Sequence, residues 1–141
     1  MDNFFLDKEK IKVIDTFRIY YFIIGGLSFL FTEIGRYLYR PFIYENKIDD
    51  YGLADSVGNW GGIIVQVFFG LAIINPNKKK GIRLILFFTI GYVIYEILQL
   101  ILPRGVFDYK DIYGTFVGGF ISLLILLTLH YFCKNKILKK Y

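Results

Sequence analysis

Four long apolar stretches, separated by charged segments, constrain this chain more than any other feature of its sequence. They cover roughly residues 17–39, 57–74, 82–102 and 112–132, and each is close to the ~20 residues that a helix needs to cross a bilayer. Backbone groups in hydrocarbon must satisfy their own hydrogen bonds, and barrel strands would alternate in polarity over about 10 residues. The sequence therefore predicts an all-α fold, a four-helix transmembrane bundle that forms one domain over residues 1–141.

The charged residues lie between and around these stretches, and their signs are unevenly distributed. Basic residues dominate before the first stretch, between the second and third, and after the fourth, whereas the other two connections hold most of the acids. Positively charged loops stay in the cytoplasm, so we expect a multi-pass protein of the bacterial cytoplasmic (inner) membrane with both termini cytoplasmic. The net charge of +5 then reflects topology and anionic lipid rather than nucleic acid. No cleavable signal peptide is evident before the first stretch.

The two halves of the chain share a pattern. Each half has a glutamate near the end of its first apolar stretch. At the start of its second stretch each half has an aspartate, then a glycine with a polar residue directly after it, and then two adjacent glycines, with other residues between. The two copies are Glu33 with residues 55–62, and Glu96 with residues 111–119. A repeat with an even number of helices keeps its orientation, so the symmetry axis would lie along the membrane normal. Two pseudo-symmetric helical hairpins are therefore a hypothesis for the arrangement.

Polar side chains gather near the outward ends of the predicted helices. A charged group inside a span costs roughly 2.5–3.5 kcal/mol, so such groups persist where they have a role. Glu33 and Glu96 would each lie about 10 Å from the outer end of a helix that rises 1.5 Å per residue. We expect the following residues to form a polar pocket open to the outer leaflet: Glu33, Arg36, Arg40, Asp55, Asn59, Glu96, Gln99, Arg104, Asp108, Asp111 and Thr115. Ion pairs that only stabilise a buried polar core are the competing interpretation.

Several of these positions also have purely structural interpretations. Asp55 and Asp111 precede the second and fourth stretches near the N-cap position, where a carboxylate accepts backbone N–H groups. Whether they only cap helices, bind a cation or line the site stays open. Small residues at four-residue spacing indicate close helix packing in a membrane. The residues interpreted in this way are Gly58, Gly62, Gly114, Gly118 and Ser122.

The segment from Tyr95 to Asp111 resembles the VanZ-like family of integral membrane proteins. The family's hallmark is a helix ending in Glu-x-x-Gln, then Arg, then Phe-Asp-x-x-Asp, then Asn and Gly. The matching residues are Glu96, Gln99, Arg104, Phe107, Asp108, Asp111 and Gly118. The family's Arg usually stands one place later, at Gly105, and Thr115 replaces its Asn. The resemblance implies an envelope-facing role, since the named member is linked to resistance to teicoplanin, which acts outside the membrane.

Three functions remain open from the sequence. The first is a non-enzymatic protein that binds an envelope lipid or lipid-linked headgroup, with Arg36, Arg40 and Arg104 contacting an anionic group through their guanidinium forks. The second is an enzyme that modifies a lipid through paired carboxylates. The third is a small ion- or proton-coupled transporter, which with four spans would have to be a homo-oligomer. The sequence has no His cluster or metal-spaced Cys, so it predicts no metal and no cofactor.

Overall fold

The computed structural model describes the backbone of residues 2–103 and 105–138 and the side chains of residues 16–103 and 105–132. Helices form every regular element in these ranges, and short turns connect them. The elements are α1 (Asp2–Ile34), the π-helical turn η1 (Gly35–Tyr39), α2 (Arg40–Glu45), α3 (Leu53–Ile74), α4 (Lys78–Leu98) and α5 (Tyr109–Leu138).

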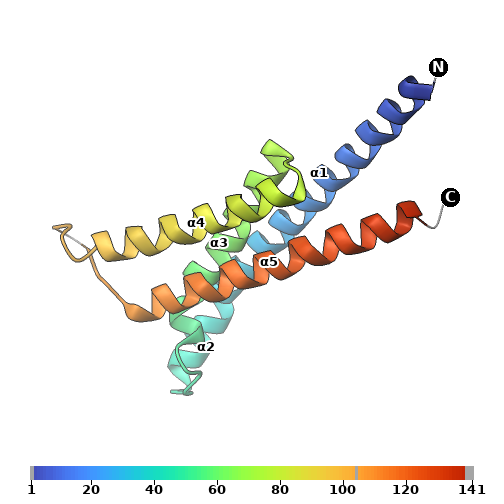
Figure 1. Cartoon of the computed structure of the whole chain (residues 1–141). Coiled ribbons are helices and arrows are strands. Elements are labelled where there is room, and N and C mark those ends of the chain that lie inside the picture. The colour runs from blue at the N-terminus through green and yellow to red at the C-terminus, as the bar shows by residue number, and fades with distance from the viewer. Residues whose placement is uncertain (1, 104, 139–141) are drawn as a thin grey trace.

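Four helical segments are long and apolar enough to cross a membrane. They are Thr16–Glu45, Leu53–Ile74, Lys78–Leu98 and Tyr109–Phe132. This confirms the all-α, four-helix architecture expected for a multi-pass membrane protein. The start of α1, the end of α5 and the α3–α4 connection lie toward one end of the bundle, and the α2–α3 and α4–α5 connections lie toward the other (Figure 1). We call the latter, with residues 46–52 and 99–108, the polar end.

Helix α3 is the centre of the bundle, because it packs against α1, α4 and α5. Its buried face supplies most of the core, including Ile63, Val67, Phe68 and Leu71. Tyr21 of α1 is buried against this core. The outer faces of α1 and α4 are covered with exposed aromatic and aliphatic side chains, as expected where lipid replaces water as the solvent.

Small residues bring α5 very close to α3. A Cβ atom at Gly118 would lie 2.4 Å from the carbonyl oxygen of Trp60, and one at Gly114 would lie 2.8 Å from the Cβ of Ser56. Ser122 is fully buried and donates a hydrogen bond to the carbonyl of Gly118 at 2.8 Å. The predicted close-packing role of this stripe is therefore confirmed.

The first hairpin uses a different glycine from those that the sequence pattern indicated. A Cβ atom at Gly61 would lie 2.2 Å from Oγ1 of Thr32, so Gly61 is the residue that lets α1 approach α3. Added Cβ atoms at Gly58 and Gly62 would meet their nearest neighbours at 3.4 and 3.5 Å, which is ordinary contact. The interpretation of Gly58 and Gly62 as tight packing positions is therefore wrong.

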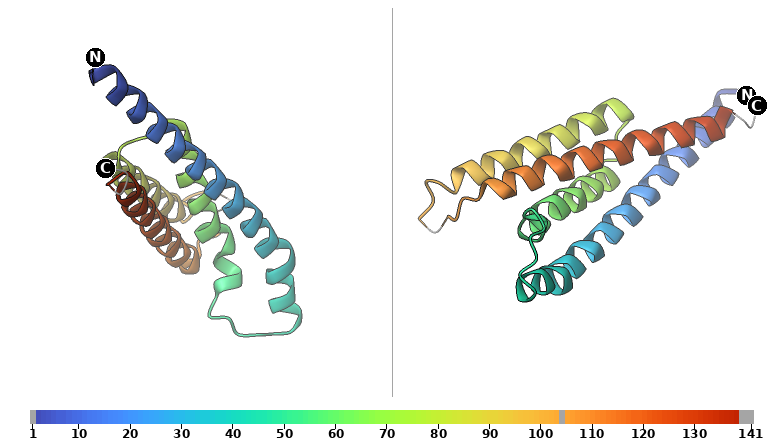
Figure 2. Two further views of the ribbon diagram at one scale, coloured as in Figure 1. Left: turned by 90° about the vertical axis from the view of Figure 1, so that its right-hand side faces the viewer. Right: turned by 90° about the horizontal axis from the view of Figure 1, so that it is seen from below.

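The first apolar helix continues past residue 39, where the sequence placed its end. Pro41 has no backbone N–H, and its ring would clash with the carbonyl four residues earlier in a regular α-helix. The wider turn of η1 accommodates it, with the backbone N–H of Arg40 bonded to the carbonyl of Gly35. The chain bends at this turn (Figure 2), and α2 then carries Arg40 and Tyr44 toward the start of α3.

Helix α4 is shorter at its end than the sequence indicated, stopping at Leu98 instead of residue 102. Pro103 disfavours a helical conformation at Leu102, so the chain turns back over the end of α4. Gly105 donates a backbone hydrogen bond to the carbonyl of Leu102 at 3.0 Å. A Cβ atom at Gly105 would lie 2.1 Å from the carbonyl oxygen of Gln99, so this return requires glycine.

Candidate functional site

A buried carboxyl group, that of Glu96, lies near the polar end between α3, α4 and α5. Only 2% of Glu96 is exposed. Nδ2 of Asn59 donates to Oε1 at 3.4 Å, and Nε2 of Gln99 donates to Oε2 at 3.1 Å. Both partners are neutral amides, and no cation among the described side chains pairs with Glu96. Burying a charge without a counter-charge is costly. Glu96 is therefore a buried acid whose charged form would be strongly destabilised in this position.

Two further carboxylates lie near Glu96 at the start of α5. Asp108 and Asp111 are close enough to Glu96 for repulsion between like charges. The Asn59 side chain is a hydrogen-bond partner of Asp111 as well as of Glu96, so it bridges the two acids. We call Asn59, Glu96, Asp108 and Asp111 the acidic seam. It combines residues of both predicted hairpins.

Gln99 joins the acidic seam to a hollow at the polar end. Its Oε1 accepts a hydrogen bond from the backbone N–H of Val106 at 3.1 Å, while its Nε2 donates to Glu96. The hollow, of about 400 Å³, is lined by Tyr95, Gln99, Leu102, Pro103 and Gly105. We call it the polar-end hollow. The Gln99 amide therefore separates its space from the Glu96 carboxylate.

A second hollow, of about 280 Å³, lies further along the span. Its lining residues are Gln66, Gly91, Tyr92 and Tyr95, and we call it the mid-span hollow. Tyr95 lines both hollows and is 56% exposed. The two hollows therefore follow one exposed side of α4 from the polar end into the apolar part of the span.

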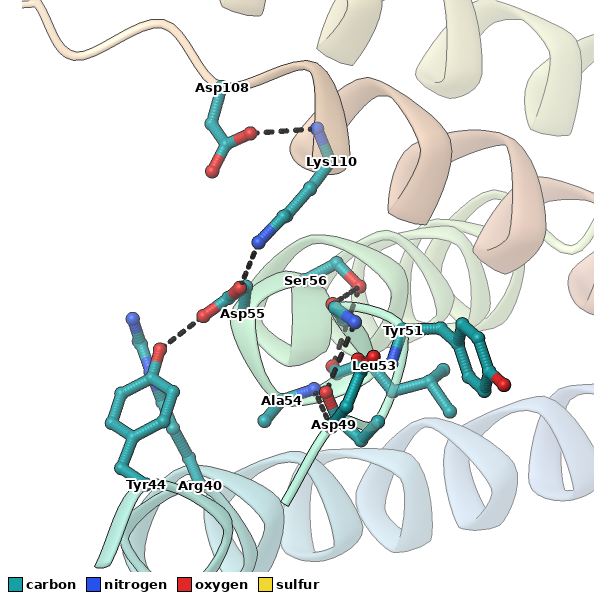
Figure 3. Close-up of polar contacts among 12 residues, drawn as sticks. Arg40, Tyr44, Asp49, Tyr51, Leu53, Ala54, Asp55, Ser56, Asp108 and Lys110 are labelled. Carbon is teal, nitrogen blue, oxygen red and sulfur yellow. Dashed lines mark hydrogen bonds and ion pairs between the residues drawn. The ribbon is translucent and has the colours of Figure 1, made fainter. Parts of the chain in front are cut away.

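A separate ionic network ties α2, α3 and α5 together around Asp55 (Figure 3). The Asp55 carboxylate accepts hydrogen bonds from the Tyr44 hydroxyl and from Nζ of Lys110, the latter at 2.5 Å. Nε of Arg40 donates to the Tyr44 hydroxyl at 3.1 Å, and the guanidinium lies 5.4 Å from the centre of the Tyr44 ring. In this network the stabilising ion-pair interpretation applies.

The helix caps are supplied by residues other than the two aspartates that the sequence indicated. The Asp50 carboxylate accepts the backbone N–H of Gly52 at 3.1 Å and that of Ala54 at 2.6 Å, which caps α3. Asp108 accepts the backbone N–H of Lys110 at 2.9 Å, which caps α5. The expected N-cap positions of Asp55 and Asp111 are therefore wrong. These two acids lie within the first turns, where their carboxylates are free to meet other side chains.

The predicted residues Glu33 and Arg36 form a third group on the α1 side of the bundle. They pair with each other at 3.5 Å, and their side chains are 30% and 54% exposed, respectively. The Arg36 guanidinium lies alongside Gly58 of α3. Arg104 lies outside the described residues. The predicted site residues thus separate into the acidic seam with Gln99 and Thr115, the Asp55–Arg40 network, and this ion pair.

Thr115 is fully buried, and its hydroxyl oxygen has no hydrogen-bond partner. The indole N–H of Trp60 is also buried without a partner, and nothing in the fold explains it. Sequence reasoning missed Tyr44, Lys110 and Tyr95. Of these, Lys110 had a detectable signal, because it is the single base between two acids at the start of the fourth stretch.

The two hairpins differ in the register of their helix contacts. Thr32 meets Gly61 in the first hairpin, and Thr89 meets Gly119 in the second. Thr32 directly precedes Glu33, whereas Thr89 lies seven residues before Glu96. The two glutamates consequently have different surroundings, and pseudo-symmetry stays a prediction.

Comparison with known proteins identifies no relative. No family model matches the chain, and neither a curated protein nor a solved structure matches it. Within the described ranges, no three His, Cys, Asp or Glu side chains come together in a way that could hold a metal ion.

Proposed function

We propose that this multi-pass membrane protein is a VanZ-like protein of the bacterial cell envelope, with both termini cytoplasmic. Its polar end binds the headgroup of a membrane lipid or a lipid-linked precursor at the outer leaflet, as a binding protein rather than an enzyme. The observation that carries this proposal is the pair of hollows along α4 that share Tyr95.

The two hollows match the two chemical parts of a lipid. The polar-end hollow lies beside the amide of Gln99 at the end of the span, where a headgroup resides. The mid-span hollow lies beside Gly91 on the exposed face of α4, where an acyl chain runs. A volume of about 400 Å³ is within the range of small-ligand pockets, about 300–1,000 Å³. A lipid lying along α4 would fill both hollows at once.

The arginines that the sequence pattern assigned to an anionic headgroup differ in their availability. Arg36 pairs with Glu33, and Arg40 donates to Tyr44. These two contacts favour a structural role for both arginines. Arg104 follows Pro103 and precedes Gly105 in the sequence, and both neighbours line the polar-end hollow. A contact between Arg104 and a headgroup phosphate stays a prediction.

A steric block of the mid-span hollow tests lipid binding directly. An added Cβ atom at Gly91 meets nothing within 4 Å, and the same is true of Gly26 on α1. Gly91 lines the mid-span hollow, so Gly91→Phe places an aromatic ring at this hollow, with room for its first side-chain atom. Gly26→Phe is its matched control outside both hollows. Native mass spectrometry of the detergent-purified proteins would count the phospholipids that each retains.

We expect wild type and Gly26→Phe to retain a phospholipid that Gly91→Phe loses. Circular dichroism would verify that the helix content of the three proteins is the same. If Gly91→Phe retained lipid as wild type does, the hollows would not be a lipid site and the proposal would fail.

A further inference from the structure

We infer that the headgroup bound at the polar end carries a primary ammonium group, which is received by Glu96, Asp111 and Thr115. This inference rests on the proposed lipid-binding function and adds the chemistry of the ligand. Two independent observations support it, namely the charge balance of the acidic seam and the unpartnered hydroxyl of Thr115.

Negative charge is in excess at this end of the protein. Residues 33–55 and 96–111 contain eight acids and five bases. Among the described bases, Arg36 pairs with Glu33 and Lys110 pairs with Asp55. Arg40 attracts Asp111 from a distance but donates its hydrogen bond to a tyrosine. Among the described residues, Glu96 and Asp111 are therefore held by an amide, and no base pairs with either of them.

The position of Thr115 follows from its neighbours on α5. Gly118 faces the α3 backbone at Trp60, and Gly119 faces Thr89 of α4. Thr115 lies one turn away from both glycines and is fully buried, so its side chain points between α3 and α4. It also lies four residues after Asp111, or about 6 Å further into the span along the same helix face. Its unpartnered hydroxyl thus forms the floor of the acidic seam.

An ammonium group fits this set of acceptors better than other headgroup chemistries. It has three N–H donors and no acceptor, which complements two carboxylates and a hydroxyl oxygen. A phosphate would be repelled by Glu96 and Asp111. A quaternary amine has no N–H to donate. Among the described residues, no group of three or more His, Cys, Asp or Glu side chains is placed to hold a metal ion.

Access to the seam depends on Gln99. Its amide forms the wall between the polar-end hollow and Glu96, to which it donates a hydrogen bond at 3.1 Å. An ammonium that entered from the hollow would replace this neutral donor with a charged one. Charge-assisted hydrogen bonds are roughly twice as strong as neutral ones, so the ammonium would hold the Glu96 carboxylate more strongly than the Gln99 amide does.

A lipid panel tests the inference with the wild-type protein. Native mass spectrometry would compare retention of phosphatidylethanolamine, phosphatidylcholine and phosphatidylglycerol with identical acyl chains, in buffer containing a metal chelator. We expect phosphatidylethanolamine to be preferred by about tenfold, the effect of one hydrogen bond to a charged group. Equal or stronger retention of phosphatidylglycerol or phosphatidylcholine would overturn the inference and leave lipid binding intact. Retention no greater than that of Gly91→Phe for all three lipids would overturn both.

A pair of isosteric variants tests the role of Thr115. Thr115→Val removes the unpartnered hydroxyl, and Thr89→Val removes a buried hydroxyl of the same interface that already donates to the carbonyl of Ile85 at 2.9 Å. We expect only Thr115→Val to reduce the preference for phosphatidylethanolamine, while retention of phosphatidylglycerol stays constant. Undiminished preference in Thr115→Val, or an equal loss in both folded variants, would contradict the assignment.

Discussion

Replacing Gly118 by alanine measures how closely α3 and α5 must pack around the acidic seam. The new Cβ atom would lie 2.4 Å from the carbonyl oxygen of Trp60 and 2.9 Å from its Cα. Since these are backbone atoms, the helices must separate by about 1 Å to reach an ordinary C···O distance of about 3.3 Å. Overpacking costs about 1–3 kcal/mol, and alanine recovers about 0.5–1 kcal/mol over glycine in a helix. We expect a net destabilisation of roughly 1–2 kcal/mol.

Reversible unfolding in mixed detergent micelles, followed by circular dichroism, would measure this change. Gly91→Ala is the control, because its Cβ meets nothing within 4 Å and the variant should be as stable as wild type or slightly more stable. Gly114→Ala should fall between the two, since its closest contact is the Ser56 side chain at 2.8 Å. If Gly118→Ala were as stable as Gly91→Ala, the reasoning about the α3–α5 contact would be refuted.

Three further perturbations test the cap, the orientation and the polar-end connection. Asp50→Ala removes the acceptor for the backbone N–H groups of Ala54, in the first turn of α3, and of Gly52, just before the helix. It should lower the unfolding free energy by about 1 kcal/mol; an unchanged midpoint in the same assay would contradict this. Tyr51 lies in the α2–α3 connection and is 92% exposed. The variant Tyr51→Cys, in a Cys133→Ser background, should react with an impermeant maleimide added to intact cells, whereas labelling only after lysis would indicate the opposite topology. Gln99→Leu removes the acceptor of the Val106 backbone N–H and should speed hydrogen exchange at this amide by about tenfold, the effect of losing one hydrogen bond. An unchanged exchange rate would show that Gln99 does not protect the Val106 amide.

The four spans could be predicted from the sequence because bilayer thickness sets a length that apolar runs must meet. Their ends were less accessible. The sequence placed the end of the first stretch at residue 39, yet a π-helical turn carries the chain past Pro41 to Glu45. It placed the end of the third stretch at residue 102, but α4 stops a full turn earlier, where Gly105 returns over Gln99. Such ends depend on how the backbone packs against itself, which local residue preferences do not encode.

The sequence indicated which polar residues of the spans to consider, but not how they group. Glu33 and Glu96 stand in similar sequence contexts, yet the Glu33 side chain is 30% exposed beside Arg36, while Glu96 is 2% exposed between two amides. The helix contacts differ in register as well, because the threonine that meets a glycine of the partner helix directly precedes Glu33 but lies seven residues before Glu96. This register fixes the direction in which each side chain points, and it is a property of helix pairs rather than of either helix alone.

The direction of the Lys110 side chain explains why Asp55 is paired with a base and Asp111 is not. Lys110 directly precedes Asp111, but successive residues of a helix do not share a face. Lys110 points to Asp55 of α3, which also accepts the hydrogen bond of the Tyr44 hydroxyl. The same pairing withholds from Asp111 the base that is closest to it in the sequence. The network that holds α5 against α2 and α3 thus leaves Asp111 without a paired base among the described residues. The ammonium group that we propose would supply positive charge at this position.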